Sequence, residues 1–267
     1  MAELLREGRR TRLAVAVLFW LVVWHLAAVA IGNPGALVGP LDVGAALIRL
    51  IPTSVFWLSL ASSALRIALG FGIAMVAGSL LGYVAHRSVW ADALLAPVFR
   101  LARTVPVAVF TILVLMWAGP YGLAVTVPAV MVAPIVYANV REGLQRGDDE
   151  LRELAELDRA TPLRYFTAVT WPSVCPYLVA ACNVGVGLAW KAGVSAEVIG
   201  LPGGSIGEVL SSAREAAATP EVLAWTVLIV TAAYLCERLV LGVLAVASPE
   251  AVHVGEAKAR VPVAVAG

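Results

Sequence analysis

Residues 65–85 read LRIALGFGIAMVAGSLLGYVA, an apolar run in which Arg66 is the one charged residue. A helix of this length is about 30 Å long, which matches the hydrocarbon core of a bilayer. Ala74, Gly78 and Gly82 recur at every fourth position, the spacing that lets membrane helices pack closely. Gly185 and Ala189 repeat this spacing. The stretch predicts a membrane helix packed inside a bundle.

The composition of the whole chain agrees with this reading. Of its 267 residues, 61% are hydrophobic and 14% are charged, against about 45–50% and about 25% in soluble domains. Six segments are long and apolar enough to cross a membrane. They are residues 13–32, 65–85, 101–118, 123–140, 174–190 and 222–245. We therefore expect an all-α integral membrane protein with about six transmembrane helices, with residues 33–64 on its outer surface.

Basic residues predict the topology. With the N-terminus in the cytoplasm, fifteen of the nineteen Lys and Arg residues fall on the inner side, as the positive-inside rule requires. The four others are Arg49, Arg66, Lys191 and Arg214. We expect a cytoplasmic N-terminus (1–12), one membrane domain (13–247) and a cytoplasmic C-terminal tail (248–267). Residues 28–30 (AVA) also fit a signal-peptidase site, but the preceding apolar run is longer than a signal peptide needs.

Motifs for catalysis are absent from the sequence. It contains no GxxxxGK[ST] loop for ATP, no HExxH helix, and no serine, histidine and acid set at matching depth. Three cysteines and three histidines are scattered and suggest neither a disulfide framework nor a metal site. We expect no enzymatic activity, no cofactor, no metal and no nucleic-acid partner. A self-powered carrier is disfavoured because the spans lack the paired buried acids of proton or sodium relays.

One charged segment interrupts the apolar pattern. Residues 141–172 read REGLQRGDDELRELAELDRATPLRYFTAVTWP and hold seven of the eighteen acidic residues. Asp148 is a candidate N-cap for a first short helix. Thr161 and Pro162 are start signals for a second helix, with Phe166 and Val169 on one face. A connector could be much shorter, so we interpret the segment as two short helices that dock on a partner protein.

Within this segment, Glu153-Leu154-Ala155, Phe166 and Trp171-Pro172 resemble the EAA loop in membrane subunits of ATP-binding-cassette (ABC) importers. The resemblance extends from about Ser63 to Glu237 and is closest to permeases of the nitrate, sulfonate and taurine type. That sub-family is indicated by Ala196-Glu197, the Gly204–Gly207 turn and Thr219-Pro220. Arg159 departs from the loop glycine of the family, and Trp171 replaces its usual leucine.

The resemblance implies a type I ABC importer permease in a bacterial-type inner membrane. The chain would form the path for a small solute, such as the anions nitrate or a sulfonate, as a homodimer with two ATPase subunits and an external substrate-binding protein. It also implies that the loop meets the ATPase through Glu153, Leu154, Ala155, Leu157, Arg159, Phe166 and Pro172. The alternatives are a self-contained carrier or channel, and a membrane scaffold without transport.

Candidate path residues lie near the end of the fifth predicted span. Lys191 and Glu197 stand in AWKAGVSAEVIG, and ionisable residues in a span suggest function. Lys191 would attract an anion, and Trp190 would form a wall of the path. Six residues turn Lys191 and Glu197 about 120° apart, so they would pair only if the helix unwinds at Gly193. Ser205 lies in the following polar run, where we expect a short surface helix. We expect Arg66, near the outer end of the second predicted span, to be an interfacial anchor.

Overall fold

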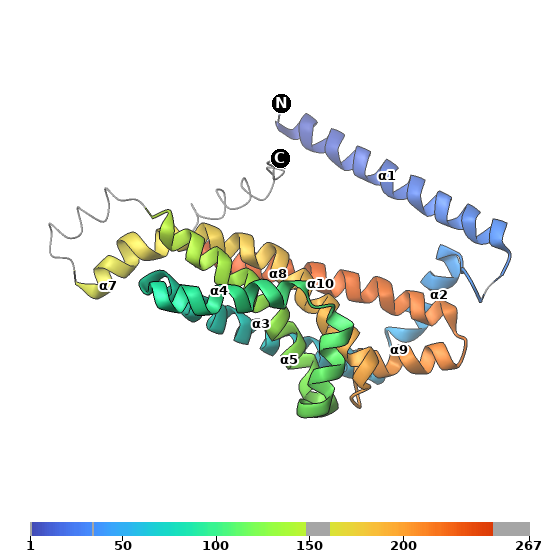
Figure 1. Ribbon diagram of the computed structural model, residues 1–267. Coiled ribbons are helices and arrows are strands. Elements are labelled where there is room, and N and C mark those ends of the chain that lie inside the picture. The colour runs from blue at the N-terminus through green and yellow to red at the C-terminus, as the bar shows by residue number, and fades with distance from the viewer. Residues whose placement is uncertain (1, 34, 148–160, 248–267) are drawn as a thin grey trace, which may run out of the picture.

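The computed structural model describes residues 2–33, 35–147 and 161–247, and these form helices without a strand. Figure 1 shows a bundle of long helices, with the N-terminal helix apart from it. The elements are α1 (Ala2–Ile31), α2 (Pro40–Leu50), α3 (Ser54–Arg87), α4 (Val89–Thr104), α5 (Val107–Gln145), α7 (Pro162–Tyr165), a π-helical turn η1 (Phe166–Thr170), α8 (Trp171–Gly200), α9 (Ile206–Glu215) and α10 (Thr219–Ala247).

The core of the bundle is formed where α3 and α8 pack against α5. Glycines make this approach possible, as the small-residue spacing predicts. A Cβ on Gly70 of α3 would lie 2.3 Å from the carbonyl oxygen of Val125, and one on Gly78 would lie 2.7 Å from Val136 Cβ. Gly185 of α8 faces Val132 in the same way. Close backbone approach is how membrane helices gain van der Waals contact where lipid offers no hydrophobic drive.

These contacts define two ends of the bundle (Figure 1). Gly143 of α5 packs on Val174 at the start of α8, beside α7; we name this the loop end, because residues 148–160 connect there. Gly200, at the other end of α8, packs on Leu123 of α5, and α9 follows; we name this the α9 end. The second part of α5 therefore runs antiparallel to α8.

Five described helices, rather than the expected six, are long and apolar enough to cross a membrane. The difference lies at residues 101–118. α4 ends at Thr104, and Val105 and Pro106 have extended backbone. Proline lacks an N–H and disfavours the helical region for the residue before it, and here the extended backbone of Val105 and Pro106 interrupts the helix. The residues of the third predicted span are thus shared between two helices.

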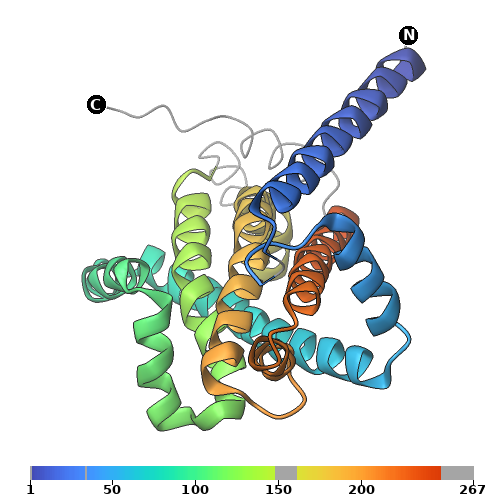
Figure 2. The same ribbon diagram turned by 90° about the vertical axis from the view of Figure 1, so that its right-hand side faces the viewer.

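A second break lies inside α5. Gly119 has φ +66° and ψ 179°, and Pro120 follows. Figures 1 and 2 show the sharp bend that results. The first arm, residues 107–118, is about 18 Å long and too short to cross alone. Its Val114 packs with Leu123 of the second arm, so the chain reaches the α9 end and turns back there.

The first helix stands apart from the bundle in both views (Figures 1 and 2). α1 touches α2, where Trp24 donates a hydrogen bond from its indole Nε1 to the carbonyl of Val38 at 3.0 Å. Most of its apolar side chains are exposed, as suits a helix surrounded by lipid.

The helix α3 begins at Ser54, eleven residues before the predicted boundary at Leu65. It begins there because Thr53 caps it by accepting a hydrogen bond from the N–H of Phe56.

Candidate functional site

A fully buried carboxylate lies at the α9 end of the bundle. Glu197, on α8, is 0% exposed. The hydroxyl of Ser63 on α3 donates a hydrogen bond to Glu197 Oε2 at 2.6 Å, and the guanidinium of Arg66 lies 3.3 Å from Oε1. Ser63 Oγ in turn accepts the N–H of Ile206, the first residue of α9, at 2.9 Å. One acidic side chain thus connects three helices.

The turn between α8 and α9 is held against α3 by further polar contacts. Leu201 ends α8 in the left-handed conformation, with φ +48°. Ser205 caps α9 by accepting the N–H of Glu208, whose carboxylate accepts the N–H of Gly204 at 2.6 Å, an arrangement close to a capping box. On α3, Ser62 donates to the carbonyl of Gly204. Contacts from α3 on one side and from α9 on the other therefore hold the turn in place.

Gly207 brings α9 directly onto α8. A Cβ there would lie 2.2 Å from the carbonyl carbon of Glu197 and 2.6 Å from its Cβ, which is closer than atoms pack. The absence of a side chain at position 207 is thus required for Glu197 to be covered. The GSIG turn, which the sequence marks only as a family cue, has a steric function in the structure.

Arg66 also contacts the bend in α5. Its guanidinium carbon lies 5.5 Å from the centroid of the Tyr121 ring, a distance at which the cation is attracted to the π face. Arg66 Nη2 donates to the carbonyl of Gly203 at 3.5 Å. We name the set Ser63, Arg66, Tyr121 and Glu197 the α9-end cluster. The cluster joins α3, the α5 bend, α8 and the turn that leads to α9.

The structure separates the four path residues proposed from sequence. Trp190 is buried in the bundle core, and Ser205 is buried as a helix cap. α8 continues through Gly193 without unwinding, so Lys191 faces outward while Glu197 points into the cluster. Arg66, which the sequence suggests as an interfacial anchor, is paired with Glu197 in the structure. No sequence pattern could show this pairing, since the two residues lie 131 positions apart.

The loop end holds the described part of the predicted docking segment. Thr161 caps α7 by accepting the N–H of Arg164, with Pro162 at the first helical position, as predicted. The helix then continues through the π-helical turn into α8, whereas the sequence predicts a separate short helix. Leu163 and Phe166 are 74% and 49% exposed, and Pro172 is exposed too. Glu153, Leu154, Ala155, Leu157 and Arg159 lie outside the described residues.

The fold and the cluster define a helical membrane protein with a structural ion pair, not a catalytic centre. Among the described residues, no three His, Cys, Asp or Glu side chains gather as metal ligands. The exposed apolar faces of the long helices match a bilayer environment.

Comparison with known proteins gives the family. Residues 70–250 match the family model of the binding-protein-dependent transport system inner membrane component, and the chain belongs to this family. It is 26% identical over 241 residues to the nitrate import permease NrtB of Synechocystis, covering 86% of each chain. It is also 26% identical to the taurine transport permease TauC of Escherichia coli, covering 84% of this chain and 82% of that one.

Solved structures agree at the level of the fold. A bacterial ABC transporter that imports alginate has a chain that superposes with a TM-score of 0.55 at 16% identity, covering 88% of this chain and 98% of its own. The MetNI methionine ABC transporter gives a TM-score of 0.52 at 20% identity, with coverage of 78% and 97%. The chain is the membrane-spanning permease subunit of an ABC importer. It is not itself an enzyme, because a separate subunit hydrolyses ATP in this family.

Proposed function

We propose that this permease passes a small solute bearing an oxyanion group, such as nitrate, bicarbonate or a sulfonate. The support is chemical: relatives are named for import of nitrate, bicarbonate, taurine and aliphatic sulfonates. All four solutes present negatively charged oxygens within a few bonds of one another. The solute would arrive on an external binding protein and pass between two copies of this chain, which two ATPase subunits serve.

The loop end is the proposed ATPase-docking surface. Leu163 and Phe166 expose apolar side chains on a helix that is continuous with α8, so force applied there would move α8 directly. Phe166 also lies 6.4 Å, between ring centroids, from Trp171 at the start of α8. We propose that Glu153, Leu154, Ala155, Leu157 and Arg159 complete this surface with Phe166 and Pro172.

The proposed orientation places the loop end in the cytoplasm, together with both termini. Arg87 and Arg141 lie near this end, at the C-terminal ends of the spanning parts of α3 and α5. Arg141 is paired with Asp92 of α4 at 2.7 Å, and Arg103 of α4 donates to the carbonyl of Pro134 at 2.6 Å. A concentration of arginine at one end supports this topology.

A coupling experiment tests the docking surface. In proteoliposomes holding the full transporter, Phe166→Ala should lower ATPase stimulation by the loaded binding protein about tenfold, because buried aromatic anchors carry much of an interface's energy. Leu239→Ala on α10 is the matched control. Leu239 is also an exposed apolar side chain, but it does not belong to the proposed docking surface. Equal stimulation in the Phe166→Ala and unsubstituted transporters would refute the docking proposal.

A further inference from the structure

One face of α8 is exposed and differs in chemistry from the exposed face of α3. Val184, Gly187, Lys191, Ser195 and Val198 follow one another at steps of three or four residues and therefore share a face. Lys191 and Ser195 are exposed, and a Cβ on Gly187 would meet no atom within 4 Å. Their neighbours Ala189, Trp190 and Ala192 are buried on the opposite side. We name this face the α8 stripe.

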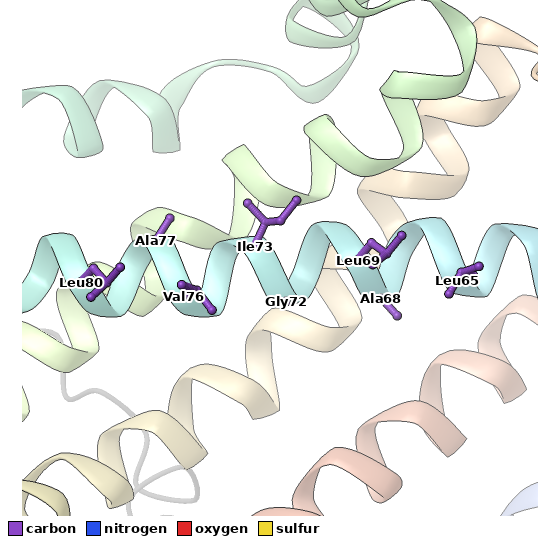
Figure 3. A pocket seen from close by; sticks show the side chains of 8 residues that line it. All are labelled: Leu65, Ala68, Leu69, Gly72, Ile73, Val76, Ala77 and Leu80. Carbon is purple, nitrogen blue, oxygen red and sulfur yellow. The ribbon is translucent and has the colours of Figure 1, made fainter.

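The exposed face of α3 provides a comparison within the same molecule. Figure 3 shows Leu65, Leu69, Ile73, Val76 and Leu80 along α3, together with small residues between them. Branched aliphatic side chains are what a face surrounded by lipid carries. Between Val184 and Val198, the α8 stripe instead presents an ammonium, a hydroxyl and a glycine. Its composition is that of a surface next to water or another polar surface.

The depth of Lys191 strengthens this contrast. From Arg66 to Arg87 on α3, and from Tyr121 to Arg141 on α5, the helices cover about 30 Å, which is the thickness of a hydrocarbon core. The level of Arg66 and Tyr121 is also the level of Glu197, because Arg66 contacts both residues. Lys191 lies six residues before Glu197 on α8, about 9 Å inside that boundary. A cation at this depth is costly on a lipid-facing surface.

The polar atoms of the stripe have no partner within the described part of the chain. Two exposed hydroxyls on α10 donate to their own helix: Thr226 to the carbonyl of Val222 at 2.9 Å and Thr231 to that of Val227 at 2.8 Å. For Ser195 and Lys191, no hydrogen bond or ion pair to a described residue is found. Both groups remain free to bind something outside the chain.

We propose that the α8 stripe lines the translocation path and that Lys191 and Ser195 bind the oxyanion of the substrate as it passes. The ammonium of Lys191 donates to the anion and supplies the opposite charge, and the Ser195 hydroxyl donates one turn further toward the α9 end. Gly187 leaves room beside them toward the loop end. This inference rests on the proposed function, and it assigns the path to a different face from the one that carries Trp190, Glu197 and Ser205.

Thiol labelling of the complete transporter tests the lining without knowledge of the substrate. The probes are methanethiosulfonate reagents with an anionic sulfonate or a cationic trimethylammonium group. Lys191→Cys and Ser195→Cys should react with both, whereas Leu69→Cys and Ile73→Cys on α3 should not react above the unsubstituted complex. If Cys at 191 and 195 is as unreactive as Cys on α3, the stripe faces lipid and the proposal is wrong.

The charge of Lys191 is tested in the Ser195→Cys background. One unit charge about 6 Å away in water changes the local concentration of a monovalent ion about threefold. Lys191→Gln should therefore lower the ratio of anionic to cationic labelling rates at position 195 about tenfold, and Lys191→Arg should preserve that ratio. An unchanged ratio in Lys191→Gln would overturn the anion site.

The same preparations separate this inference from the proposed function. Stimulation of ATPase activity by the loaded binding protein in the unsubstituted complex reports on the importer as a whole. Normal stimulation with unreactive 191 and 195 positions would remove the stripe from the path and leave the proposed function intact. Absent stimulation would refute the proposed function whatever the labelling shows.

Discussion

Arg66 and Glu197 carry the largest electrostatic interaction among the described residues of the α9 end. Glu197 is fully buried, while the Arg66 side chain is 18% exposed. Removing a charge from water costs several kcal/mol, which is recovered only when hydrogen bonds and an opposite charge surround it. Ser63 and Arg66 supply both for Glu197. The two partners are therefore not equivalent, because loss of Arg66 leaves a buried anion and loss of Glu197 leaves a cation with access to solvent.

This asymmetry gives a stability prediction. Arg66→Met should destabilise the protein by about 3–5 kcal/mol, because Glu197 would stay buried without its cation. Glu197→Gln should cost less, since the amide still accepts from Ser63, and the double variant should cost less than the sum of the two. Thermal unfolding of the detergent-solubilised transporter measures this. Arg214→Met, on the exposed face of α9, is the control; equal unfolding temperatures for Arg66→Met and Arg214→Met would contradict the prediction.

At the scale of the element, the breaks at Val105–Pro106 and Gly119 determine how the chain crosses the bundle. α4 is held to the second arm of α5 by the Asp92–Arg141 ion pair and by stacking of Phe99 on Tyr137, with centroids 4.2 Å apart. Next to the break, Arg103 joins the end of α4 to the second arm of α5 by donating to the carbonyl of Pro134. This part of the chain therefore consists of two helices, α4 and the first arm of α5, and not of one continuous span.

Gly119 should be sensitive to substitution through its backbone alone. Its φ and ψ are accessible essentially to glycine only, and a Cβ there meets no atom within 4 Å. Gly119→Ala should cost about 1–3 kcal/mol from strain. Gly44→Ala is the control, because Gly44 also has open space but lies in regular helix in α2, where alanine is favoured by up to about 1 kcal/mol. Unfolding temperatures of the two variants that agree within error would argue against strain at Gly119.

At the scale of the whole molecule, the two ends of the bundle have different chemistry. The loop end carries exposed apolar side chains beside arginines, and the α9 end carries a buried polar cluster. α8 connects them directly, with η1 and α7 at one end and Glu197 at the other. A displacement of α7 by a partner would thus be transmitted along one helix to the α9-end cluster and past the α8 stripe.

A whole-molecule prediction separates the importer from a self-contained carrier or channel. Liposomes holding this chain alone should show no uptake of nitrate or taurine, because the chain has no energy source and no relay of buried acids in its described spans. Uptake should require the ATPase, ATP and the loaded binding protein together. Native mass spectrometry should then find two copies of this chain with two ATPase subunits. Steady uptake by the chain alone would favour the carrier.

The sequence by itself determined the membrane class, the helical content and the start of α7 at Thr161-Pro162. Hydrophobic runs of bilayer length, small residues at every fourth position and start signals such as Thr161-Pro162 act within a few turns of one helix. Such local patterns can be read without neighbours. The same locality explains why the short helix after Ser205 was predicted correctly.

Only the tertiary structure decided which polar side chains share a site. Arg66, Ser63 and Glu197 meet because α3 and α8 pack side by side on α5, a contact between residues more than 130 positions apart. Packing also decided that Trp190 and Glu197 turn inward while Lys191 and Ser195 turn outward, although all four lie within eight positions on one apolar helix. Periodicity places residues on the faces of a helix, but contact with neighbouring helices determines which face is buried.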